Sequence, residues 1–158
     1  MPNTVPKVPT SLEEQVRWLV DRAAVGDLIT AFSRSLDARD EQALPTLVTE
    51  DVVFAFGDQV LATGREAFVG SALGAMGRYA ATWHCPAHPA IDVDGDTAVS
   101  RSYHTGIHLD DAKAPHEHGD GGGWYDCEYR READGWRLSR IRLTIVWTSG
   151  GGDRPIEK

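Results

Sequence analysis

Apolar positions in the first part of the chain recur at helical spacing. The apolar residues Val16, Leu19, Val20 and Ala23 are spaced by three, one and three positions, as expected for one face of a helix. Thr10 and Ser11 precede this series, and each has a glutamate three positions later. That spacing is a capping box, so we expect a helix to begin near residue 11.

The same period continues through Phe32 and Leu36 in a second segment that ends at Asp37. Asp21 could cap this segment, and Gly26 offers a break between the two helices, because glycine is a poor helix former. The pattern therefore predicts two consecutive helices before residue 38.

The next pattern mixes helices with a first strand. The stretch "DEQALPTLV" predicts a short third helix, capped by Asp40 and disturbed by Pro45. The β-branched and aromatic run "DVVFAF" then predicts a strand. Thr63 and Glu66 form a further capping box, which predicts a fourth helix directly after Thr63.

From residue 80 onward the pattern changes to strands. Two β-prone runs flank Asp94-Gly95 and two more flank Asp134-Gly135, which predicts two hairpins. The polar, glycine-rich segment 110–123 between them is expected to be a mobile edge loop or a lid over a site. Helices followed by an antiparallel sheet indicate an α+β domain, with the helices on one face of a strongly curved sheet. We expect one domain over residues 11–149, a flexible arm at 1–10 and a flexible tail at 150–158.

Composition narrows the class of partner. The net charge of -8 and the scattered basic residues argue against nucleic acid, and no apolar run is long enough to span a membrane. The first ten residues contain three prolines and no apolar core of a secretory signal, so we expect a cytoplasmic protein. Small neutral or apolar ligands are the expected partners.

One stretch, "HCPAH", raises a choice between a metal site and a catalytic base. His84, Cys85 and His88 are metal-ligating residue types, and His104 and His108 repeat the spacing of four in "HTGIH". On a strand, however, four residues span roughly 13 Å, too far for two ligands of one zinc ion. We therefore expect no metal, and no nucleotide-binding glycine motif indicates a cofactor.

Asp37 is a candidate partner for His84. A carboxylate that accepts a hydrogen bond from one imidazole nitrogen fixes the tautomer and leaves the other nitrogen as a base. From these residues alone a purely structural alternative stays open, in which His84 is a hydrogen-bonded structural residue and Asp37 is a surface charge at a helix end.

The order of elements adds a resemblance. The stretches "RAAVGDLITAFSRSLDARD", "LVTEDVVF", "TGREAFV" and "YRREADGWRLSR", with His84 ten residues before the Asp of "VDGD", resemble the SnoaL-like domains of the nuclear-transport-factor-2-like superfamily over about residues 12 to 148. Those domains are cones of helices against a bent antiparallel sheet that enclose an apolar pocket. Relatives include polyketide cyclases, scytalone dehydratase, bile-acid dehydratase and hexachlorocyclohexane dehydrochlorinase.

The resemblance implies a function and a set of site residues. It predicts a cofactor-independent lyase or isomerase, most simply a dehydratase, in which Asp37 orients His84 to remove a proton from a small hydrophobic, cyclic substrate. Phe32 stands where those enzymes carry a tyrosine or a lysine, so assistance to the leaving group is in question. The predicted substrate contacts are Phe32, Phe54, His104, Trp124 and Arg142.

Two further expectations follow. His104 is preferred over Tyr103 as a pocket residue, because alternation along a strand lets only one of them face inward. Neither set of alternating residues in the last strand, "RLTIVW", is uniformly polar, which predicts a homo-oligomer, most simply a dimer. The alternative function is a non-catalytic module that binds an apolar ligand or supplies a dimer interface, since this fold does not by itself require an enzyme.

Overall fold

The computed structural model describes residues 6–150. Within that range the chain forms two helices, a short 3-10 turn and six strands, which lie in one sheet. In chain order the elements are α1 (Leu12–Ala38), η1 (Leu44–Leu47), β1 (Val48–Phe56), β2 (Gln59–Thr63), α2 (Arg65–Met76), β3 (Ala81–Asp94), β4 (Thr97–Leu109), β5 (His118–Glu132) and β6 (Gly135–Gly150).

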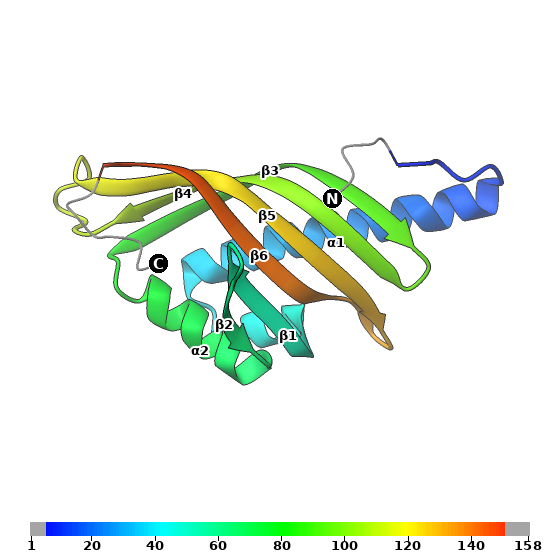
Figure 1. Cartoon of the computed structure of the whole chain (residues 1–158), viewed down its shortest axis with the longest axis horizontal. Coiled ribbons are helices and arrows are strands. Elements are labelled where there is room, and N and C mark those ends of the chain that lie inside the picture. The colour runs from blue at the N-terminus through cyan, green and yellow to red at the C-terminus, as the bar shows by residue number, and fades with distance from the viewer. Residues whose placement is uncertain (1–5, 151–158) are drawn as a thin grey trace.

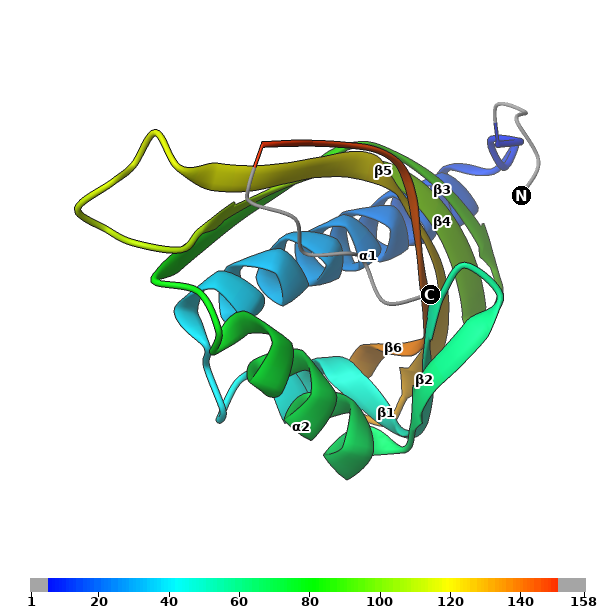
Figure 2. The ribbon, with the colours of Figure 1, turned by 60° about the vertical axis from the view of Figure 1, so that its left-hand side comes forward.

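The sheet bends around the long helix, as expected for a cone-shaped α+β fold. Its strand order is β2-β1-β6-β5-β4-β3, and α1 crosses the concave side while α2 lies along the lower rim (Figures 1 and 2). All neighbouring strands are antiparallel except β1 and β6, which run parallel. The sheet is therefore mixed, whereas the sequence pattern predicted an antiparallel one.

Helix α1 is continuous, so the predicted break at Gly26 is wrong. A glycine inside a helix costs only about 1 kcal/mol relative to alanine, and a Cβ at this position would lie 3.8 Å from the side chain of Ile91 on β3. Asp21 is not a cap either. It is buried inside the helix, where it accepts hydrogen bonds from Arg131 (2.7 Å) and from the indole nitrogen of Trp136 (3.1 Å).

The other predicted helix starts have different outcomes. Ser11 caps α1 and exchanges hydrogen bonds with Glu14, as the capping box predicted. Asp40 accepts hydrogen bonds from two backbone N–H groups, but the short third helix is only the 3-10 turn η1, which contains Pro45. Thr63 belongs to β2, and α2 begins after Gly64 without a side-chain cap, so the second capping box is not formed.

Both predicted hairpin turns are present, at Asp94-Gly95 and before Gly135, and each glycine has a positive φ. The connection between the hairpins is shorter than predicted, because β5 already begins at His118. Residues 118–123 therefore belong to the sheet and not to a loop, and only residues 110–117 connect β4 to β5.

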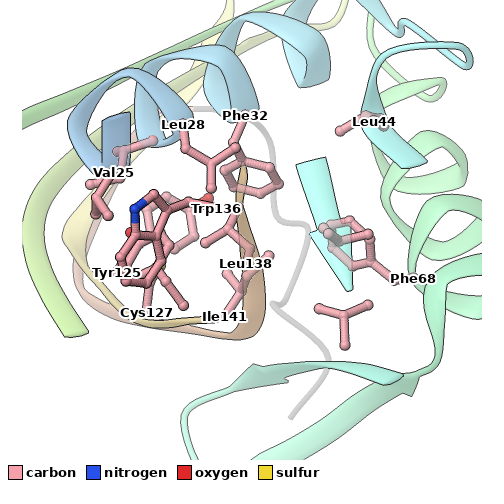
Figure 3. Close-up of a cluster of buried hydrophobic side chains, with 14 of the residues drawn as sticks. Val25, Leu28, Phe32, Leu44, Phe68, Tyr125, Cys127, Trp136, Leu138 and Ile141 are labelled. Atoms are coloured by element: carbon pink, nitrogen blue, oxygen red, sulfur yellow. The ribbon is translucent and has the colours of Figure 1, made fainter. Parts of the chain in front are cut away.

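The core lies between α1 and the concave face of the sheet. Figure 3 shows Val25, Leu28 and Phe32 of α1 facing a group of side chains from β5 and β6 that includes Trp136 and Ile141. Toward the C-terminal end of α1 this packing opens, and a cavity takes the place of the core. Among residues 6–150, no helix has the length and apolar character needed to cross a membrane.

Candidate active site

A cavity of about 630 Å³ lies between the concave face of the sheet, the C-terminal half of α1 and helix α2. Its walls carry aromatic and aliphatic side chains, interrupted by three histidines on β3 and β4 and by acidic residues in the β4–β5 region. The residues that matter for the chemistry below are Phe32, Phe54, Phe56, Phe68, Arg78, Tyr79, His84, His104, His108, Asp110, Asp120 and Tyr125.

Asp37 and His84 meet at the wall of this cavity. Asp37 lies in the last turn of α1, and the inner-facing residues Thr82 and His84 alternate along β3, opposite that helix end. The Oδ1 atom of Asp37 lies 2.6 Å from Nδ1 of His84 and accepts a hydrogen bond from the Thr82 hydroxyl at 2.9 Å. Its Oδ2 atom accepts the backbone N–H of His84 at 2.9 Å.

These contacts determine how His84 presents its ring. A carboxylate accepts hydrogen bonds only, so Nδ1 of His84 carries the proton in this contact and Nε2 is left with a lone pair. His84 is buried and lines the cavity. The pair thus has the geometry of a base held in one tautomer by a fixed carboxylate.

Three histidine rings gather at this point because of one glycine. His84 of β3 is paired with Gly106 of β4, and His104 and His108 lie two residues to either side of that glycine on the same face. The ring of His84 stacks on His104 at 5.3 Å and meets His108 edge-on at 5.2 Å, measured between ring centroids. A Cβ on residue 106 would lie 3.2 Å from both His104 and His108, so any side chain there would displace the rings.

Burial sets the charge state of the two histidines on β4. Burial above all, together with the neighbouring His84 and His108, lowers the pKa of His104 to about 4. Burial also lowers the pKa of His108. Both rings are therefore neutral at pH 7 and do not add positive charge to the cavity.

The inner wall of β5 is made of glycine. Gly119 and Gly121 are paired with His108 and Gly106 respectively, and both line the cavity. Without side chains at these positions, the volume in front of the histidines stays open.

The structure separates the predicted substrate contacts into two groups. Phe32, Phe54 and His104 line the cavity, and Tyr103 points away with 64% of its surface exposed. Trp124 and Arg142 lie outside the lining.

The placement of Trp124 and Arg142 corrects the sequence interpretation. Trp124 stacks under the guanidinium of Arg101, while its neighbour Tyr125 takes the inner position. Arg142 pairs with the buried Asp126 at 3.3 Å on that same outer face. Both side chains are one residue out of phase with the inner positions of their strands.

The metal alternative for "HCPAH" has no support in the geometry. His84 points into the cavity, and His88 sits at a bulge of β3 with φ of 49° and is exposed. Among residues 6–150, no group of three or more His, Cys, Asp or Glu side chains is arranged to hold a metal ion. Cys85 and Cys127 are both free thiols.

His108 and Tyr125 are among the cavity residues that the sequence interpretation missed. His108 was considered only as a metal ligand, although its spacing of four from His104 already placed both on one strand face. Tyr125 was hidden beside Trp124, and nothing in the local pattern indicated which of these two aromatic residues faces inward.

Comparison with known proteins agrees with this architecture. The family model of the SnoaL-like domain matches residues 17–142. The chain belongs to the SnoaL-like family. No curated protein sequence matches it.

Several solved structures have the same fold as the chain. The Kfla4162 protein of Kribbella flavida is 22% identical, with a TM-score of 0.77 over 84% of this chain and 95% of the other. A candidate scytalone dehydratase from Novosphingobium aromaticivorans is 25% identical, with a TM-score of 0.75 over 89% and 95%. A hexachlorocyclohexane dehydrochlorinase from Novosphingobium barchaimii shares the fold at 17% identity, with a TM-score of 0.74 over 88% and 95%.

Proposed function

We propose that this SnoaL-like protein is a cofactor-independent lyase or isomerase that removes a proton from carbon in a small hydrophobic, cyclic substrate. The observation that carries the proposal is the Asp37–His84 pair at the wall of a cavity large enough for a compound of two or three rings. The family match and the structural relatives named as dehydratase and dehydrochlorinase support the same class.

The proposed elimination needs only these two residues for its proton balance. Nε2 of His84 takes the proton from a carbon next to an activating group, and Asp37 stabilises the imidazolium that forms. The electron pair of the broken C–H bond forms the new double bond as a hydroxyl group departs from the next carbon. The imidazolium returns its proton to the departing oxygen, which leaves as water, and His84 is again neutral.

The lining favours an uncharged substrate. Phenylalanine side chains form much of the wall, and Asp110 and Asp120 contribute negative charge. Among residues 6–150, Arg78 is the single basic residue of the lining other than histidine. A carboxylate or phosphate ester would be repelled by the acidic groups. We therefore propose hydroxylated cyclic ketones and related polycyclic compounds as the substrate class.

The test is a screen with matched variants. Purified protein is incubated with a panel of hydroxylated cyclic ketones, and loss of water is followed by mass spectrometry and by the absorbance of the new conjugated double bond. His84→Ala and Asp37→Asn should each lower the rate by about 10² to 10⁴, because general base catalysis contributes a factor of that size. His116→Ala, at a residue with 79% of its side chain exposed, is the control.

Two outcomes would contradict the proposal. If a compound is dehydrated and His84→Ala retains the wild-type rate, the base has been misassigned. The second outcome is that no compound is dehydrated and that the activated C–H exchanges with deuterium no faster with the protein than in D₂O buffer alone. The protein then does not abstract protons from this class.

A second candidate function is supported by Phe32. Its ring packs against Phe68 and Tyr125, so the wall next to Asp37 ends in an apolar side chain that cannot donate a proton. A non-catalytic module would bind the same compounds without converting them. Binding that persists unchanged in His84→Ala, without turnover by the wild type, would favour this function.

A further inference from the structure

Tyr125 is a buried cavity residue that the proposed elimination does not use. It lies on the inner face of β5 with 5% of its surface exposed. Its ring meets Phe32 edge-on at 5.9 Å and lies 4.6 Å from the ring of His104, measured between centroids. Tyr125 is therefore in direct contact with one predicted substrate contact on α1 and another on β4.

The hydroxyl group of Tyr125 differs from that of the other buried tyrosine. The hydroxyl of Tyr129 is hydrogen-bonded to Ser100 at 2.8 Å inside the core. For Tyr125, none of the hydrogen bonds found among residues 6–150 engages the hydroxyl, although the side chain lines the cavity. A buried tyrosine normally pairs its O–H, so this one is free to pair with a cavity occupant.

A second polar atom beside it is also without a partner. The Nδ1 atom of His104 is fully buried and makes no hydrogen bond within the described part of the chain. Nδ1 itself is closed off from the cavity, so a bound molecule can reach the His104 ring only through its other atoms. The hydroxyl of Tyr125 is therefore the unpaired polar group that an occupant of this part of the cavity can reach.

Both groups are uncharged around pH 7. Burial raises the pKa of Tyr125 and lowers the pKa of His104 to about 4, so the phenol keeps its proton and the imidazole does not gain one. An uncharged hydroxyl donor favours a substrate oxygen that is neutral when it binds and becomes negative during the reaction.

We propose that Tyr125 is a further substrate-contacting residue, which donates its hydroxyl hydrogen bond to a carbonyl or phenolic oxygen of the substrate, beside His104. This assignment rests on the proposed function in that it places the substrate in the same cavity. As His84 removes the proton from the carbon next to a carbonyl group, part of the negative charge develops on the carbonyl oxygen, and the electron pair then becomes the new double bond as the hydroxyl group departs. Tyr125 stabilises the oxyanion through its hydrogen bond and transfers no proton.

The test measures binding alone, with two probes of nearly equal size. The aromatic probes 2-naphthol and 2-methylnaphthalene differ by a hydroxyl group in place of a methyl group, and their affinities are measured by the fluorescence of the naphthalene ring. Wild-type protein should bind 2-naphthol about tenfold more tightly than 2-methylnaphthalene after correction for their different solubilities, because one neutral hydrogen bond is worth about that factor.

Tyr125→Phe keeps the ring and removes only the hydroxyl. The preference for 2-naphthol should then fall to about twofold, while the affinity for 2-methylnaphthalene stays unchanged. Tyr129→Phe is the matched control, since it removes a buried tyrosine hydroxyl outside the lining and should leave both affinities as they are. A preference that survives in Tyr125→Phe would overturn the proposal, as would absence of any preference in the wild type.

These results are independent of the screen for elimination. If the protein binds 2-naphthol through Tyr125 but dehydrates nothing, the oxygen contact stands and the proposed reaction fails. If it eliminates water at equal rates with tyrosine or phenylalanine at residue 125, the reaction stands and the assignment of Tyr125 fails.

Discussion

The buried imidazole of His104 should make the protein lose stability as the pH falls from 7.5 to 5.0. Its pKa is about 4 in the folded state, against 6.5 for an unperturbed histidine. Between these two values the unfolded chain binds a proton that the folded chain does not, so the free energy of unfolding falls as the pH falls. Well above pH 6.5 neither state is protonated at residue 104 and the effect is absent.

The magnitude follows from the two pKa values. At pH 5.0 the unfolded chain is almost fully protonated at residue 104 and the folded chain hardly at all, which corresponds to a loss of about 2 kcal/mol. Below pH 4 the loss levels off near 3 kcal/mol. His108 adds a contribution of the same sign, because burial lowers its pKa as well.

Urea unfolding measured at several pH values between 5.0 and 7.5 checks this prediction. His104→Asn will change the stability at every pH, because the ring is lost, but its pH dependence should be flatter than that of the wild type by about 2 kcal/mol over the range. His116→Asn, at an exposed residue, should run parallel to the wild type. Parallel curves for His104→Asn and the wild type would refute the assignment of a depressed pKa to His104.

Three other predictions concern a close backbone contact, a buried ion pair and an exposed tryptophan. Gly123→Ala should unfold the protein or lower its stability severely, because the added Cβ would lie 1.8 Å from a carbonyl oxygen of β6, whereas Gly121→Ala meets only contacts of 3.7 Å or more and should keep the thermal midpoint nearly unchanged. Arg131→Ala should cost about 2 kcal/mol in urea unfolding, since it leaves the buried carboxylate of Asp21 without its charged partner, and an unchanged midpoint would contradict that pairing. A homodimer is expected by light scattering, and Trp83→Ser, at a tryptophan that is 57% exposed on the outer face of β3, should shift it toward monomer.

The features of the fold that could be predicted from the sequence are those that depend on local patterns. The glutamate three residues after Ser11 defined the start of α1, and the Asp-Gly pairs defined both hairpins, because these features depend on a few neighbouring residues. Gly26 misled the prediction, since its effect on the helix was outweighed by packing against β3. Similarly, Thr63 is the last residue of strand β2, and the local capping pattern contains no information about this strand.

The candidate site shows the same division. A resemblance to known domains was needed to link Asp37 with His84, because 47 residues separate them and no local pattern requires their contact. Trp124 was predicted as a substrate contact but lies outside the cavity lining, because aromatic residues occupy both faces of β5 at that point and the phase depends on pairing with β4 and β6. Arg142 pairs with the buried carboxylate of Asp126 and lies outside the cavity lining. These two residues become neighbours only when β5 and β6 pair in the sheet.

The position of β6 has a consequence for how the chain folds. It is the last described strand in the sequence, yet it lies in the middle of the sheet, between β5 and the parallel strand β1. The pair β1–β2 is joined to the rest of the sheet only through β6. During synthesis this hairpin therefore cannot be joined to the sheet of β3, β4 and β5 until β6, which ends at residue 150, has been made. Pairing over such a long separation in sequence slows folding. During that delay the edges that β6 will cover on β1 and β5 are exposed, which makes them the points where pairing with a wrong strand is most easily started.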